Sequence, residues 1–196
     1  MTDWSLAEIR ALATKAARGA GLEWGLAEEA GYAVAWLEAR CAPGTQALAS
    51  WLEVTGEMDA EHCPIRIGAA LVDAGKPPEH GHELAVCQPM LLAPFLAQFA
   101  VPERVYALSW DDGGYYLSSD GLVSAEAGSA NPIGNLVGCR WTIESSSPGT
   151  PDCRTRVPYE ASDAVAVLSK FAAKTYAPAT EASRISGAGA GLSDND

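Results

Sequence analysis

Helical and strand-like periodicities occupy separate parts of this 196-residue sequence. Apolar residues recur every three or four positions up to residue 56, whereas short alternating or continuous apolar runs dominate from residue 62 onward. Strands and helices do not alternate regularly, as they would in a doubly wound sheet. The sequence therefore predicts an α+β fold in one domain, residues 1–196, with a helical lobe over 1–56 and an α+β lobe over 62–196.

The start of the chain carries the clearest helix signal. Ser5 and Glu8 have the spacing of a capping box, and Trp4 and Ile9 have the spacing of a hydrophobic staple. A helix is therefore expected to begin at Leu6. Two further helical patterns follow, around Leu26–Leu37 and Leu48–Leu52, so the N-terminal part is predicted to be a three-helix unit with short connections.

Two glycines lie within or beside the second helical pattern. Gly25 and Gly31 lack side chains, and we expect both to let a neighbouring backbone approach closely. The remaining elements are expected to form a mixed or antiparallel sheet, a C-terminal helix and a glycine-rich tail. In order they are a buried strand over 64–72, a helical segment from Pro89 that bends at Pro94, a hairpin over 104–117, a half-buried strand over 135–144, an edge strand over 154–159, a helix from Ser162 and a short segment over 180–184.

The charge balance disfavours two classes of partner. The chain has 25 acidic and 13 basic residues and a net charge of −12, which repels phosphate backbones and anionic lipid surfaces. No stretch approaches the roughly 20 apolar residues of a membrane-spanning helix, and no signal peptide is visible. We therefore expect a cytoplasmic protein that binds neither nucleic acid nor membranes.

Clusters that could hold a metal or a nucleophile are poorly spaced. His62, Cys63, His80 and His82 are the nearest candidates for metal ligands, but their spacing matches no common zinc pattern, and His80 and His82 lie in a Pro-rich stretch typical of a solvated loop. Nucleophile elbows, phosphate-binding loops and metalloprotease motifs are missing from the sequence. We expect no metal and no cofactor, and whether the protein is an enzyme stays open.

Aromatic residues are expected to stabilise the core rather than stack on a ligand. The tryptophans at positions 4, 36, 51, 110 and 141 fall on periodic apolar faces, and Trp24 is the expected exception. The five cysteines are scattered and odd in number, so a disulfide framework is not expected.

The C-terminal tail is the candidate binding segment. Three glycines spaced by two could turn their amides toward an anion, and a preceding Ser-Arg pair could complement it. A dinucleotide fingerprint is excluded because Leu192 occupies the position of the third glycine. The other interpretation of the tail is a polar extension without a site. The predicted ligand-binding residues are Ser183, Arg184, Gly187, Gly189, Gly191 and Asp194.

The segments Trp4–Ala30 and Ser183–Asp196 together resemble a proteobacterial family known only as a domain of unknown function. The resemblance implies a bacterial, non-secreted protein, and it implies no activity, cofactor or catalytic residue. Two hypotheses follow from the sequence. The first is a protein that binds, or binds and acts on, a small polar or anionic metabolite at the tail. The second is a non-catalytic assembly protein, a homo-oligomer or partner-binding protein with a large apolar face on its first or second helix.

Overall fold

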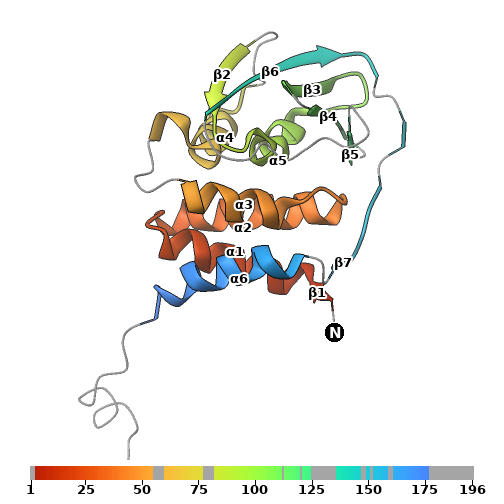
Figure 1. Ribbon diagram of the computed structural model, residues 1–196. Coiled ribbons are helices and arrows are strands. Elements are labelled where there is room, and N and C mark those ends of the chain that lie inside the picture. The colour runs from red at the N-terminus through yellow and green to blue at the C-terminus, as the bar shows by residue number, and fades with distance from the viewer. Residues whose placement is uncertain are drawn as a thin grey trace, which may run out of the picture.

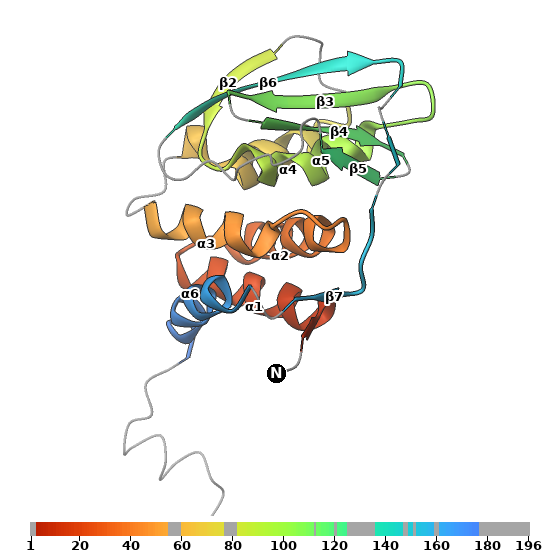
Figure 2. The same ribbon diagram turned by 45° about the vertical axis from the view of Figure 1, so that its right-hand side comes forward.

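The computed structural model stacks the chain in four layers (Figures 1 and 2). The first layer holds α1 (Leu6–Gly19) and α6 (Ser162–Ala173), and the second holds α2 (Trp24–Ala39) and α3 (Gly44–Val54). The third contains α4 (Pro64–Asp73) and α5 (Ala93–Leu96), and a five-stranded sheet covers them. The structure describes residues 3–54, 60–76, 82–111, 113–119, 121–124, 136–146, 149–150, 152–158 and 161–176. The predicted segment over 180–184 lies outside these ranges.

The N-terminal three-helix unit is confirmed in detail. The Ser5 hydroxyl accepts a hydrogen bond from the Glu8 amide, and the Glu8 carboxylate accepts one from the Ser5 amide, so the predicted capping box is present and α1 begins at Leu6. Helix α6, from the other end of the chain, packs against α1 and α3. The α+β class, with N-terminal helices and a C-terminal helix, is therefore as predicted.

Small residues let α1 and α2 pack closely, but only one of the two glycines works as predicted. A Cβ on Gly31 would lie 2.9 Å from the Arg10 carbonyl oxygen and 2.1 Å from the Thr14 hydroxyl, so the close approach of α1 needs glycine there. A Cβ on Gly25 would meet no described atom within 4 Å. The prediction for Gly25 is wrong because this first turn of α2 lies at the surface.

Residues 64–73 form helix α4, and the buried strand predicted over 64–72 is wrong. Pro64 occupies the first helical turn, where its missing amide costs no hydrogen bond. Ile65 and Gly68 are buried three positions apart, which is a helical spacing. A Cβ on Gly68 would lie 2.2 Å from the Phe95 ring, so glycine lets the ring pack on α4. This contact joins α4 to α5.

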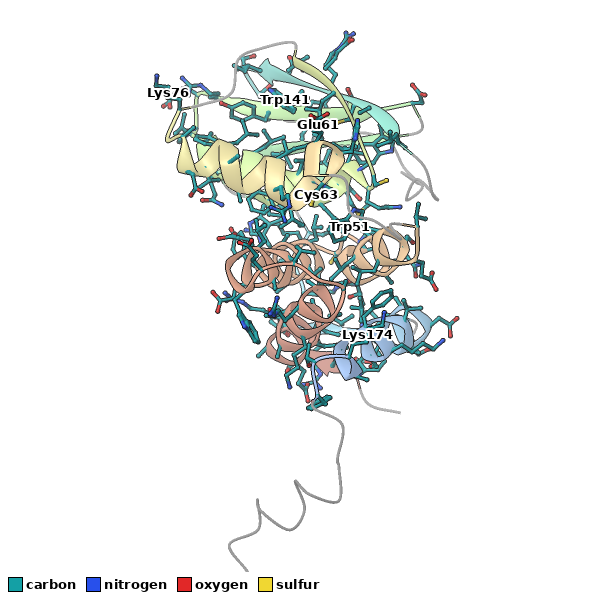
Figure 3. All side chains as sticks on the ribbon, turned by 90° about the vertical axis from the view of Figure 1, so that its left-hand side faces the viewer. Trp51, Glu61, Cys63, Lys76, Trp141 and Lys174 are labelled. Atoms are coloured by element: carbon teal, nitrogen blue, oxygen red, sulfur yellow. The ribbon has the colours of Figure 1, made fainter. Side chains whose placement is uncertain are left out.

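Helical structure from Pro89 is confirmed, as is its division near Pro94. The segment consists of η2 (Pro89–Leu92), α5 and η3 (Ala97–Phe99). All three are short because Pro94 has no backbone N–H to donate a helical hydrogen bond. One further short helix, η1 (Ala60–His62), precedes α4. Figure 3 shows Trp51 in the α2–α3 layer, Cys63 where α4 faces that layer, and Trp141 in the sheet layer.

The sheet has the strand order β2-β6-β3-β4-β5, and every neighbouring pair is antiparallel. The predicted hairpin and the strand over 135–144 are confirmed as β3–β4 and β6, whereas β2 and β5 were not predicted. One face packs on α4 and α5 (Figure 2), and along β6 the buried Cys139 and Trp141 alternate with exposed or half-buried residues. The strands are β2 (His82–Val86), β3 (Val105–Trp110), β4 (Gly113–Ser118), β5 (Gly121–Ser124) and β6 (Val137–Glu144).

A segment over 152–158 links the sheet to the helices. It contains β7 (Arg156–Val157), which pairs with β1 (Trp4–Ser5) as a short edge strand. Arg154 forms an ion pair with the carboxylate of Glu38, whose side chain is 2% exposed. The Arg154 Nε also donates to the backbone carbonyl oxygen of Glu38 over 2.7 Å. The Thr45 amide and hydroxyl donate to the same carboxylate at 2.8 and 2.6 Å, so the buried charge is fully hydrogen-bonded.

The tryptophans follow the prediction. Trp51, Trp110 and Trp141 are buried, and Trp4 and Trp36 pack against the core. Trp24 is 58% exposed, and the Arg18 guanidinium lies 5.4 Å from its ring centre.

A candidate ligand site on the outer face of the sheet

A cavity of about 530 Å³ opens on the face of the sheet that turns away from the helices. Its lining comes from three neighbouring strands, β2, β6 and β3, and the residue that follows β3. The exposed members alternate with buried members, whose side chains point toward the helices and whose backbone forms the floor. The lining residues are Glu83, Leu84, Ala85, Ser109, Trp110, Asp111, Gly138, Cys139 and Arg140.

The register of the strands explains why the sheet is hollow there. Arg140 lies between Glu83 and Ser109, which forms one row of exposed residues across the sheet. In the next row Gly138 lies opposite Ala85. Asp111 follows the last paired residue of β3, so it returns to the exposed face beside Gly138. This second row contains an alanine and a glycine, and they leave the backbone uncovered.

Gly138 is the centre of the hollow. A Cβ built on this residue would meet no heavy atom within 4 Å among the residues that the structure describes. Its φ angle is not in the left-handed region, so neither sterics nor backbone conformation demands glycine. Glycine in a strand costs stability, and its effect here is to keep the cavity open.

The rim carries three charges. Arg140 forms a cross-strand ion pair with Glu83, and the two side chains are 56% and 62% exposed. Asp111 is also exposed. Two carboxylates and one guanidinium leave one negative charge on the rim. An exposed ion pair contributes only about 0–1 kcal/mol, so a ligand can compete for either partner.

The buried residues beneath the hollow offer no reactive group. Burial raises the pKa of the Cys139 thiol to about 12, so this sulfur stays protonated near neutral pH and is a poor nucleophile. The Trp110 ring packs edge-on against Tyr115 with 5.7 Å between ring centres. Burial raises the pKa of Tyr115 to about 12 as well. These side chains point toward the helices, so the rim groups and the exposed backbone are what the hollow offers to a ligand.

A second hollow lies between α1 and α6, and its chemistry differs. It has a volume of about 400 Å³ and is lined by Glu8, Ala11, Leu12, Lys15, Ser169, Ala172, Ala173 and Tyr176. The Lys15 ammonium lies 5.9 Å from the Tyr176 ring centre. The Glu8 carboxylate already accepts hydrogen bonds from Ser5, and the Ser169 hydroxyl donates to the Val165 carbonyl oxygen. Few polar groups of this groove are therefore left to fix the orientation of a ligand, so the sheet cavity is the stronger site.

The ligand-binding residues predicted from the sequence cannot be compared with this cavity. Ser183, Arg184, Gly187, Gly189, Gly191 and Asp194 all lie outside the described residues. They remain predictions.

The predicted metal-ligand candidates are only partly described. His80 and the side chain of His82 lie outside the described part, although the backbone of His82 begins β2. His62 ends η1, and Cys63 precedes α4 with its thiol buried. Burial raises the pKa of Cys63, which disfavours the thiolate that a metal requires. Within the described ranges, no three His, Cys, Asp or Glu side chains come together as a metal site.

The large apolar face predicted for the assembly hypothesis is not found on α1 or α2 where the structure describes them. Helix α2 lies between the α1–α6 layer and the α4–α5 layer (Figure 2), and its residues are buried on both sides. The exposed large apolar side chains among the described residues are far apart in the sequence. They are Trp24, Val54, Val101, Leu136 and Tyr176. Oligomer formation therefore remains a prediction without support from a shared apolar surface.

The fold and the site together define an α+β protein with a ligand-sized cavity on an open sheet. Residues 4–76 match the model of a family described as Protein of unknown function (DUF3726). The match confirms the predicted resemblance to an uncharacterised family, and it covers the first four α-helices but not residues 183–196. No curated protein and no solved structure matches the chain. In the part of the chain that the structure describes, every helix falls short of the length and apolarity needed to cross a bilayer.

Proposed function

We propose that this protein binds a small polar metabolite in the cavity on the outer face of the sheet. The observation that carries the proposal is the hollow itself, which the Ala85–Gly138 pair opens between charged side chains. Its volume of about 530 Å³ lies within the range of known small-molecule sites, about 300–1,000 Å³. A guanidinium, two carboxylates and a hydroxyl converge on it.

The sequence predicts a small polar or anionic metabolite, and our proposal keeps the polar metabolite, disfavours the anionic one and gives the ligand a different location. The sequence hypothesis puts the ligand at Ser183, Arg184 and the glycines of the tail. The rim of the sheet cavity carries a net negative charge, and the chain as a whole carries −12. Both charges disfavour multiply anionic ligands such as phosphates. Polar ligands that are neutral, zwitterionic or cationic fit the sheet cavity better.

A thermal-shift screen tests the proposal. The full-length chain is heated with a metabolite panel of amino acids, sugars, polyols, carboxylic acids and phosphates. A ligand at about 100 times its Kd stabilises the folded state by about 2.7 kcal/mol, which raises the Tm by about 5–11 °C for a chain of this size. We expect at least one hit whose shift is lost in Arg140→Gln and kept in Arg10→Gln, an exposed arginine on α1.

The same screen separates the two locations. A chain that ends at Tyr176 lacks the whole tail but retains every residue that lines the sheet cavity. If the site is the sheet cavity, the truncated chain gives the same hits as the full chain. If truncation removes the hits and Arg140→Gln does not, the tail is the site and our proposal is wrong. A screen without any hit would also contradict it.

A further inference from the structure

The arrangement of charges around the sheet cavity specifies a ligand class, provided that the cavity is the binding site as proposed above. Arg140 and Gly138 follow each other on the exposed face of β6, about 7 Å apart. Strands β2 and β3 flank β6, so Glu83 and Asp111 stand on opposite sides of the hollow, roughly 10 Å apart across the sheet. A ligand over Gly138 therefore has one cationic and two anionic neighbours.

When no ligand is bound, the Arg140 guanidinium forms an ion pair with the Glu83 carboxylate. Both side chains are more than half exposed, so the pair is weak and Arg140 can exchange its partner. A ligand carboxylate offers the guanidinium two parallel hydrogen bonds, which is the geometry that arginine favours. Glu83 then loses its partner, and the rim needs a positive charge beside Glu83 and Asp111.

We propose that the ligand is an amino acid or a closely related amino carboxylate. Its carboxylate binds Arg140, and its ammonium group lies between Asp111 and Glu83. The two carboxylates share the ammonium, so both charged groups of the ligand have a partner on the rim, and the net charge of the site stays at −1. A simple carboxylic acid would leave both rim carboxylates without a cation. A simple amine would bind Asp111 alone and make no use of Arg140, which would stay with Glu83. The side chain of the ligand lies over Ala85, the small residue that pairs with Gly138.

Isothermal titration with chemically matched probes tests this ligand class. The standard amino acids are titrated into the full-length protein, and the best binder is compared with its N-acetyl derivative and its primary amide. The first derivative lacks the ammonium charge and the second lacks the carboxylate charge. We expect each to bind at least about tenfold more weakly, because each loses a charge-assisted hydrogen-bonding group.

Two variants assign the contacts. Asp111→Asn should reduce the preference for the free amino acid over the N-acetyl derivative, because only Glu83 then faces the ammonium, and Arg140→Gln should abolish the preference over the amide. Asp163→Asn, at an exposed position in the first turn of α6, is the control and should change neither ratio.

The outcomes separate this inference from the proposed function. If a sugar or polyol binds in the cavity and no amino acid does, the cavity is a ligand site but the ligand class is wrong. Equal affinity for the amino acid and both derivatives also refutes the ligand class. If no probe binds and the metabolite panel gives no hit, the proposed function itself fails.

Discussion

Replacing Gly138 by tyrosine should close the cavity while preserving or improving the fold. A Cβ at this position meets no described atom within 4 Å, and the backbone is ordinary strand. Glycine within a strand is destabilising by roughly 0.5–1 kcal/mol relative to alanine, and tyrosine is among the better strand formers. We therefore expect Gly138→Tyr to gain about 0.5–1 kcal/mol of stability, a rise in Tm of about 1–4 °C.

The ligand should be lost at the same time. The tyrosine ring would lie over Ala85 and beside Asp111, in the volume that the proposed ligand occupies. The assay is thermal shift with the hits of the metabolite screen, followed by titration calorimetry. The matched control is Thr142→Tyr, which adds the same ring to the same strand and face but outside the cavity. A Gly138→Tyr protein that folds and binds with unchanged affinity would refute the cavity as the site.

Further predictions concern the packing of the fold and its response to pH. Arg154→Ala leaves the buried Glu38 carboxylate without its cation and should cost about 3–5 kcal/mol in urea unfolding, whereas loss of an exposed pair costs at most about 1 kcal/mol. Gly31→Ala should lower the Tm because its Cβ meets the α1 backbone, and Gly25→Ala should raise it by adding helix propensity at an open position. The pKa of Cys139 is raised to about 12 from 9.0, so the folded state keeps a proton that the unfolded state loses. The free energy of unfolding should keep its full value below pH 9 and fall as the pH rises toward 12. Cys139→Ala should reduce that fall.

The sequence predicts those parts of the fold whose causes are local. The capping box at Ser5 and Glu8 involves residues three positions apart, so its two hydrogen bonds are implied by the sequence alone. The β3–β4 hairpin is similar, because its strands alternate and a short turn joins them directly. In both cases the interacting groups are neighbours along the chain.

Helix α4 shows where local patterns become ambiguous. The run from Pro64 to Val72 is apolar and contains β-branched residues, which suits a buried strand and a buried helix equally. The contact with Phe95 favours the helix over the strand, because the Phe95 ring occupies the space at Gly68 and packs on the helical face. That contact spans 27 positions in the sequence, so the periodicity of the run does not reveal it. The proline at the start of the run was the local signal that favoured the helix.

The candidate site depends on register, and register is the property that a single sequence specifies least. Asp111 has the sequence context of a turn residue, and Gly138 gives no signal in a strand whose other residues alternate well. Both become part of one cavity only because β6 lies between β2 and β3, in a register that pairs Gly138 with Ala85. A shift of β6 by one residue would turn Cys139 outward and bury Arg140 against the helices, at a large cost in free energy. The burial of Cys139 and Trp141 therefore fixes the register of β6, and the same register places Arg140 and the gap at Gly138 on the surface.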